Sequence, residues 1–176
     1  FIRIYFIVTT LIRSHERIMN FLRVWAYLAI IADLWAWRQQ TFGFDNTEWA
    51  WLLAGASRTH IIGGTIRYFS FFSDAANFGC SIAASAVVFY IITITTTLKK
   101  DKILFFIAAV LSTYGFFVSG TRTGLLCFMV GVALYVVLSK SFKIAVPVVI
   151  LGGIFYCLLA FTQIGQGNMQ IRRMRS

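Results

Sequence analysis

The sequence predicts an all-α, polytopic integral membrane protein, built as a bundle of about six transmembrane helices. Of its 176 residues, 59% are hydrophobic and only 12% are charged, and apolar runs near 20 residues recur along the chain. A soluble domain is about 25% charged, and about 20 consecutive apolar residues suffice to cross a bilayer. These observations exclude a soluble enzyme with a single buried core.

The predicted spans follow one another between short polar turns. They lie at about 1–12, 18–38, 74–97, 103–119, 123–138 and 144–162. The first is too short to cross the bilayer, so we expect a truncated helix there. The turns are expected at 13–17, at the basic stretch 99–102, at 120–123 and near Lys140 and Lys143. Pro147 falls in the first turn of the last span, where it breaks no helical hydrogen bond.

The lysines predict the orientation of the bundle. All five lie in the turns at 99–102 and 140–143, which odd–even counting places on one side. Short cytoplasmic loops are enriched in Lys and Arg, so this side is predicted to face the cytoplasm. Segments 38–73, 120–123 and 163–176 then face outward. Arginines at the chain end run against the bias, and a long outer domain after residue 176 would explain them.

The outward segment 38–73 predicts a short helix at about 47–56, lying on the outer membrane surface. Asp45-Asn46-Thr47 supplies capping oxygens, and Glu48 suits the positive end of a helix. Its apolar face would combine tryptophans at interfacial depth with leucines. The residues of that face are Trp49, Trp51, Leu52 and Leu53.

Outward-facing arginines are the first candidates for chemistry. Arg122 lies in Ser119–Gly124, between two spans, beside small residues and the start of a helix. Helix N-termini and guanidinium groups both bind phosphate well, because each offers directed N–H donors. An arginine that only reaches lipid headgroups is the alternative for this position.

Arg67 is the second candidate, with Asp74 and Asn77 as supporting residues. Ser73 is a plausible N-cap for the span at 74–97, and Asp74 and Asn77 share a helix face. The three side chains could form a polar cluster at the mouth of a site. Simple capping together with a local Arg67–Asp74 pair is the alternative from spacing.

Two further titratable residues have simpler explanations. Asp33 is the one acid deep in a predicted span, and such residues suggest a site, although five residues separate it from Arg38 and it could reach the interface. His60 could act as a base on the outer side, but a loop histidine is usually structural.

Several common kinds of site are missing from the sequence. Cys80, Cys127 and Cys157 lie in apolar runs, and no two cysteines or histidines stand at ligand spacing. Paired carboxylates, a P-loop and a GxSxG elbow are also missing. We therefore expect no metal and no cofactor. The net charge of +10 does not indicate nucleic-acid binding, because the basic residues are scattered between apolar runs.

Three stretches resemble the O-antigen ligase and O-antigen polymerase superfamily, most closely the bacterial O-antigen ligase-like proteins. They are GTIRYFSFFSDAANFG at 64–79, SGTRTGLL at 119–126 and QIGQGNMQIRRMRS at 163–176, in the family's order. The resemblance covers about residues 38–176. It implies a multi-pass protein of the bacterial inner membrane that carries its active site on the periplasmic face.

The resemblance also implies an activity. Such enzymes transfer a glycan, without a metal, from undecaprenyl-diphosphate to an acceptor such as lipid A–core, and arginines hold the diphosphate. Arg67 and Arg122 match the arginine-bearing motifs. The family's catalytic histidine lies in a periplasmic loop after the last span, so the base is expected beyond residue 176. We therefore interpret residues 1–176 as one transmembrane domain of a longer protein, with further helices after it, and expect the isolated fragment to be inactive.

Three other functions stay open at this stage. A polymerase of the same superfamily shares the donor and the chemistry. A transporter would require ionisable groups at mid-membrane, of which the sequence offers only Asp33. A non-catalytic membrane scaffold is the third.

Overall fold

The structure is a computed structural model that describes residues 14–62 and 65–139. Four helices in this part of the chain are long and apolar enough to cross a membrane. The elements are α2 (His15–Phe42), α3 (Asn46–Trp51), a π-helical segment (Leu52–Ala56), α4 (Ser57–His60), β1 (Ile61–Ile62), β2 (Thr65–Ile66), α5 (Ala75–Thr95), α6 (Lys99–Ser119) and α7 (Arg122–Ser139). The spans predicted at 1–12 and 144–162, the turn near Lys140 and Lys143, and Pro147 lie outside the described residues.

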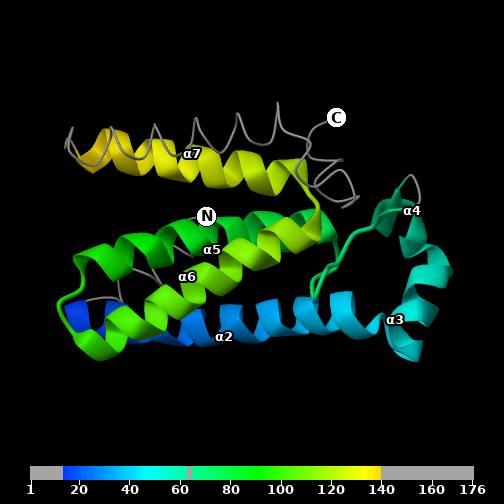
Figure 1. Cartoon of the computed structure of the whole chain (residues 1–176), viewed down its shortest axis with the longest axis horizontal. Coiled ribbons are helices and arrows are strands. Elements are labelled where there is room, and N and C mark those ends of the chain that lie inside the picture. The colour runs from blue at the N-terminus through cyan, green and yellow to red at the C-terminus, as the bar shows by residue number, and fades with distance from the viewer. Residues whose placement is uncertain (1–13, 63–64, 140–176) are drawn as a thin grey trace.

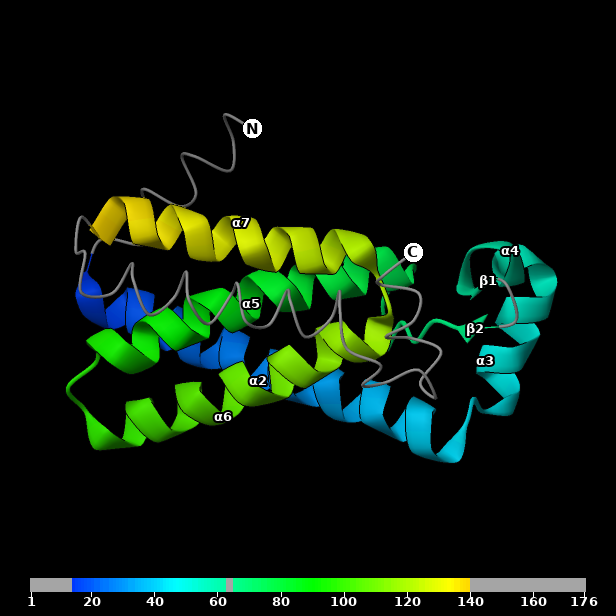
Figure 2. The same ribbon diagram turned by 45° about the horizontal axis from the view of Figure 1, so that its top comes forward.

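The four long helices run in alternating directions along a common axis (Figure 1). At one end α2 and α6 finish and α5 and α7 begin, and α3, α4 and the strands gather there beyond α2 (Figure 2). We call this end the α3 end. The opposite end carries Lys99, Lys100 and Lys102 and is called the lysine end. Helix α5 packs on both α6 and α7, and α2 packs on α6.

Small residues allow these helices to approach one another closely. On α2 the buried alanines recur at helical spacing, and α6 also has small buried residues. They are Ala26, Ala29, Ala32 and Ala36 on α2 and Ala108, Ala109, Ser112 and Gly115 on α6. In lipid, where hydrophobic driving force between helices is weak, such surfaces gain close van der Waals packing. The all-helical prediction is confirmed in the described residues, apart from the antiparallel pair of two-residue strands β1 and β2.

Two predicted turns are wrong, because their residues begin helices. Helix α2 starts at His15, since the Ser14 hydroxyl oxygen accepts a hydrogen bond from the Arg17 backbone N–H at 3.3 Å. At the lysine end Lys99 to Lys102 form the first turn of α6, where Asp101 favours the helix N-terminus. The actual connection between α5 and α6 is 96–98.

The predicted link at 120–123 is likewise shorter than expected. Gly120 ends α6 with a left-handed backbone, φ 60°, and α7 already begins at Arg122. A glycine suits this helix end, because its missing Cβ removes the steric penalty of positive φ.

The helix predicted at 47–56 is present as α3 followed by the π-helical segment. Asp45 is its N-cap, and Asp45 and Glu48 form a reciprocal capping box. Gly55, at φ 133°, interrupts the helical backbone. The expected apolar face is not shared by all four residues: Leu52 is buried in a cluster with Phe69 and Ala75, whereas Trp49, Trp51 and Leu53 are exposed.

Candidate functional site

Glu48 joins α3 to the last turns of α2. Its carboxylate accepts hydrogen bonds from Arg38 at 2.7 Å, from the Gln39 side chain at 2.8 Å and from the Trp35 indole at 3.0 Å. The Asp45 backbone N–H donates to the same carboxylate at 2.8 Å. Charged hydrogen bonds of this kind are stronger than neutral ones. Glu48 therefore fixes the position of α3 on the end of the membrane helix.

Both acids at this junction are held in their charged form. The Thr47 hydroxyl and the Glu48 backbone N–H donate to Asp45 and lower the pKa of its carboxyl. Burial opposes ionisation of Glu48, but hydrogen bonds from Gln39, the Asp45 backbone, Arg38 and Trp35 outweigh it and lower its pKa. The attachment of α3 is thus electrostatic at neutral pH.

Gln39 and Ser70 clasp the loop before α5 to the side of α2. The Ser70 backbone N–H donates to the Gln39 side-chain oxygen at 2.9 Å, and the Gln39 amide donates back to the Ser70 carbonyl at 3.1 Å. The Ser70 hydroxyl also donates to the Ala32 carbonyl at 2.7 Å. Ser70 is held at φ 55°, a conformation that costs a non-glycine residue about 1 kcal/mol. These buried bonds stabilise that conformation.

Arg67 lies three residues before this clasp and is half-buried. Its backbone N–H donates to the His60 carbonyl at 2.8 Å, and its guanidinium donates to the Thr59 carbonyl at 3.2 Å. The segment that carries Arg67 is therefore anchored on both sides, to α4 and to α2.

His60 is part of an aromatic cluster. It is 1% exposed, and its Nδ1 lies 2.8 Å from the Thr59 hydroxyl and 2.9 Å from the Ala56 carbonyl. Its ring makes edge contacts with Trp51 and Phe69, at centroid distances of 5.0 and 4.7 Å. His60 is therefore packed into the aromatic cluster, and its buried Nε2 has no hydrogen-bond partner among the described residues.

Arg122 is exposed at the start of α7, and the residue before it takes part in a close contact between two sequence motifs. The Ser119 and Thr121 hydroxyls, both buried, lie 3.0 Å apart. A Cβ at Gly79 would lie 2.2 Å from the Thr121 hydroxyl oxygen, and one at Gly124 would lie 3.0 Å from the Gly79 carbonyl oxygen. The Asn-Phe-Gly stretch of α5 and the Ser-Gly-Thr-Arg stretch before α7 therefore pack directly on each other.

The predicted N-cap Ser73 is wrong, because Asp74 has the extended backbone of a cap and accepts a hydrogen bond from the Ala76 backbone N–H. The ion pairs of the described residues are Arg23–Asp101, Arg38–Asp45 and Arg38–Glu48. The Arg67–Asp74 pair is thus not among them, and Asn77 is exposed. Of the residues predicted together, the structure places Arg67 and Arg122 at the same end of the bundle and assigns Asp74 to capping.

Several residues that shape this end had no distinguishing signal in the sequence. Gln39 is one of two adjacent glutamines at the end of an apolar run, and Ser70 stands among phenylalanines. Glu48 was expected only as a residue near a helix N-terminus. The contacts of all three depend on segments about ten to thirty residues apart, which local patterns do not bring together.

Among residues 14–62 and 65–139, no three His, Cys, Asp or Glu side chains cluster as a metal site would require. Comparison with protein-family models, with curated proteins and with solved structures finds no match to the chain.

Proposed function

We propose that this chain is part of an O-antigen ligase-like glycosyltransferase of a bacterial inner membrane, with the α3 end facing the periplasm. It would move a glycan from undecaprenyl-diphosphate to an acceptor hydroxyl such as that of lipid A–core. The observation that carries the proposal is the contact of Gly79 with Thr121 and Gly124. It joins the two arginine-bearing motifs at the end opposite the lysines.

The proposal includes details of the membrane arrangement. Residues 1–12 and 144–162 would add two spans to the four long helices. Helix α3 would lie at the outer interface, where Trp49 and Trp51, 39% and 40% exposed, can reach the headgroup layer. The lysine end would then face the cytoplasm, in keeping with the positive-inside bias.

In the proposed reaction the sugar–phosphate bond of the donor breaks and a glycosidic bond to the acceptor oxygen forms. The acceptor proton passes to a base located after residue 176, and undecaprenyl-diphosphate leaves with inversion at the sugar. Arg67 and Arg122 would bind the diphosphate and stabilise its growing negative charge. Preorganised donors in a water-poor site contribute several kcal/mol to such a step.

The direct test uses Arg67→Ala and Arg122→Lys in the full-length protein, with Lys100→Ala at the lysine end as the matched control. We expect glycan transfer to fall about tenfold or more in both arginine variants. Alanine removes the guanidinium donors at position 67, and lysine lacks the bidentate geometry of arginine at position 122. The control should transfer normally. Normal transfer by both arginine variants, at normal expression, would remove these residues from the site.

The acceptor identifies which member of the superfamily the protein is. Purified full-length protein is supplied with the carrier-linked glycan and either lipid A–core or a second carrier-linked glycan. Transfer to lipid A–core supports the ligase, and transfer to the second glycan supports the polymerase. Transfer to neither acceptor contradicts a glycosyltransferase of this kind.

Orientation is tested by single cysteines placed at 67, 122 and 100 in a cysteine-free background. A membrane-impermeant maleimide applied from the periplasm should label positions 67 and 122 and spare position 100. The reverse pattern contradicts the proposal, because the diphosphate would then meet the wrong end of the bundle.

A further inference from the structure

A second polar feature lies inside the bundle, away from the arginines. Asp33, in α2, is 1% exposed, and its Oδ2 accepts a hydrogen bond from the Ser112 hydroxyl of α6 at 2.9 Å. Its other oxygen, Oδ1, is buried and has no hydrogen-bond partner in the described part of the chain. A Cβ at Gly115 would lie 2.1 Å from Oδ1. The absence of a side chain at Gly115 therefore leaves the space this oxygen occupies.

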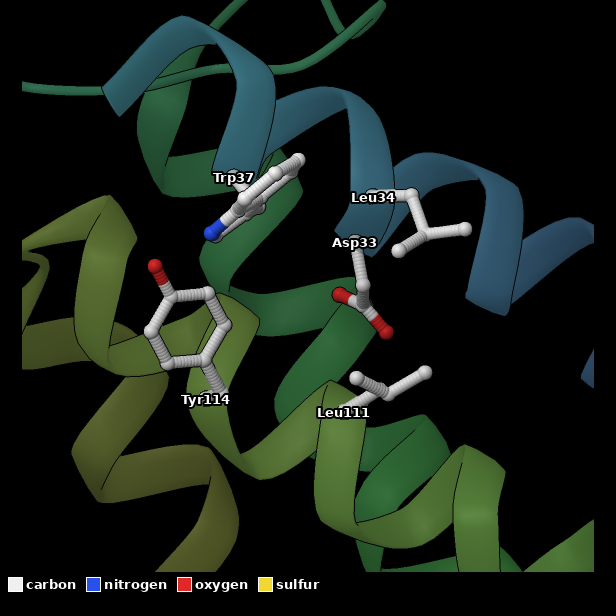
Figure 3. Close-up of a pocket in the computed structure, with 5 residues that line it drawn as sticks. All are labelled: Asp33, Leu34, Trp37, Leu111 and Tyr114. Carbon is white, nitrogen blue, oxygen red and sulfur yellow. The ribbon is translucent and has the colours of Figure 1, made fainter. Parts of the chain in front are cut away.

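Asp33 is one of five residues that line a pocket of about 390 Å³ between α2 and α6. Figure 3 shows Trp37 and Tyr114 on one side of the carboxylate and Leu34 and Leu111 on the other. Leu34 and Trp37 are 49% and 45% exposed, so the pocket opens to the outside of the bundle. In a membrane-spanning helix that outside is hydrocarbon.

The two guanidinium groups of α2 that lie nearest to Asp33 in the chain are engaged with other acids. Arg38 is five residues beyond Asp33 and pairs with Glu48 at 2.7 Å and Asp45 at 3.4 Å. Arg23 is ten residues before it and pairs with Asp101 at 2.7 Å. Neither supplies a positive charge to Asp33.

The other elements packed around Asp33 supply none either, since the lysines of α6 (Lys99, Lys100 and Lys102) lie in its first turn, at the lysine end. Helix α5 contains no Asp, Glu, Lys, Arg or His, and its titratable side chains are Cys80 and Tyr90. On α6 the Tyr114 hydroxyl donates to Gln40, and Tyr68, in the loop before α5, packs against the same core. Within the described residues the carboxyl group therefore has no cationic partner.

We propose that this pocket binds a lipophilic organic cation, an ammonium group on an apolar body, and that Asp33 holds a proton while the pocket is empty. An isolated carboxylate in a low-dielectric interior is strongly disfavoured, so it needs either a proton or a bound cation. The faces of Trp37 and Tyr114 attract cations, and the leucines accommodate an apolar body. When the ligand enters, the Asp33 proton leaves to water and the carboxylate pairs with the ammonium. This site does not depend on the proposed glycosyltransferase.

The test uses the full chain in phosphatidylcholine nanodiscs with phenyltrimethylammonium, and with tert-butylbenzene as its neutral isostere. Equilibrium dialysis measures binding of each above protein-free nanodiscs. We expect the ammonium to bind about tenfold or more tightly than the isostere at alkaline pH. Because the probe keeps its charge, its affinity should rise with pH as Asp33 loses its proton. Equal binding of the two probes would overturn the proposal.

Asp33→Asn provides the matching variant, since an amide oxygen can still accept the Ser112 hydrogen bond. It should remove both the preference for the ammonium and the pH dependence. Asp101→Asn, at the lysine end, should leave both unchanged. An Asp33→Asn protein that binds the ammonium as tightly as the parent contradicts the proposal.

A measurement on the unsubstituted protein covers the case of a variant that does not fold. Dicyclohexylcarbodiimide enters from hydrocarbon, and a protonated carboxyl adds across its C=N bond to give an acylisourea, which rearranges to a stable N-acylurea. Peptide mapping should find this mass gain on Asp33, decreasing as pH rises and blocked by phenyltrimethylammonium. An unmodified Asp33 at acid pH would show that the site carries no accessible proton and would refute the proposal.

Discussion

The two ends of the bundle are built on different principles. At the lysine end, α5 passes to α6 through residues 96–98, and one bidentate pair, Arg23–Asp101, joins α2 to α6. At the α3 end, buried polar groups around Gln39, Glu48 and Ser70 hold more than thirty residues between α2 and α5. The lysine end is thus a short connection with one ion pair. The α3 end is a long segment held in one geometry by buried hydrogen bonds.

The largest expected effect comes from Gln39→Leu. The substitution leaves the Ser70 N–H and carbonyl without their partner, and each buried group so orphaned costs about 1–3 kcal/mol. Glu48 loses one hydrogen bond but keeps those from Trp35 and Arg38. We expect a loss of about 3 kcal/mol, measured by denaturation in nanodiscs, and faster proteolysis within 57–66. Gln40→Leu, one residue on and exposed, loses only the exposed hydrogen bond from Tyr114 and should change stability by only about 0.5 kcal/mol. Equal losses of stability from the two substitutions would show that the bonds between Gln39 and Ser70 do not stabilise the α3 end.

Gly79→Ala tests the close contact at the α3 end. The added Cβ would lie 2.2 Å from the Thr121 hydroxyl oxygen and 2.5 Å from that of Ser119, which must then move together with the start of α7. We expect a loss of about 2 kcal/mol in the same measurement.

Gly131→Ala is the matched control, farther toward the lysine end of the same α5–α7 interface. The nearest atoms to its Cβ would be the two Val87 methyl groups, at 3.1 and 3.3 Å, and alanine favours a helix by up to about 1 kcal/mol over glycine. A control variant as unstable as Gly79→Ala would mean that the whole interface, and not the motif contact, is sensitive.

At the lysine end, Arg23→Gln should destabilise the fold by less than Gly79→Ala does. Asp101 is 5% exposed and would lose its partner, although lysines stand beside it in the first turn of α6. The double variant Arg23→Gln/Asp101→Asn should be more stable than the single one, because no charge is left unpaired. A double-mutant cycle measures the difference, and additive losses would show that the pair is not coupled.

The smallest effect is expected from mild acid. Folding lowers the pKa of Glu48 and Asp45, so their stabilising contribution is present at neutral pH and is lost as pH falls through the lowered values. Because both groups are partly exposed, the loss should be confined to the α3 end and seen as proteolysis within 57–66. Glu48→Gln should weaken that pH dependence. Cleavage in the connection at 96–98 should stay unchanged, and a change there would indicate global unfolding.

Hydropathy predicted the four long helices of the described residues, because each coincides with an apolar run long enough to cross a membrane. The boundaries failed where polar residues continue a helix, as at Lys99–Lys102, since charge marks the membrane edge rather than the helix end. Local capping chemistry predicted α3 from Asp45 and Glu48. The break after α3 falls at Gly55, whose φ of 133° suits glycine, but the way the chain continues into α4 depends on packing rather than on a local pattern.

For the candidate site, the sequence supplied Arg67 and Arg122 but not what positions them. The contact of Gly79 with Thr121 joins residues 42 positions apart, and the clasp between Gln39 and Ser70 spans 31. Glycine and serine are common for many local reasons, so their role is visible only once the helices pack. Asp33 was recognisable as an unusual intramembrane acid, yet its Ser112 partner and the pocket beside it required the fold.

The clasp also bears on the order in which the chain assembles. Its partners lie within residues 32–70, so it can close once α2 and the following segment have left the ribosome, before α6 exists. The Asp33–Ser112 bond must wait until α6 is inserted, 79 residues later. Early local closure reduces the loop entropy that later helices must overcome. The α3 end is therefore positioned to serve as the template on which the remaining helices are docked during synthesis.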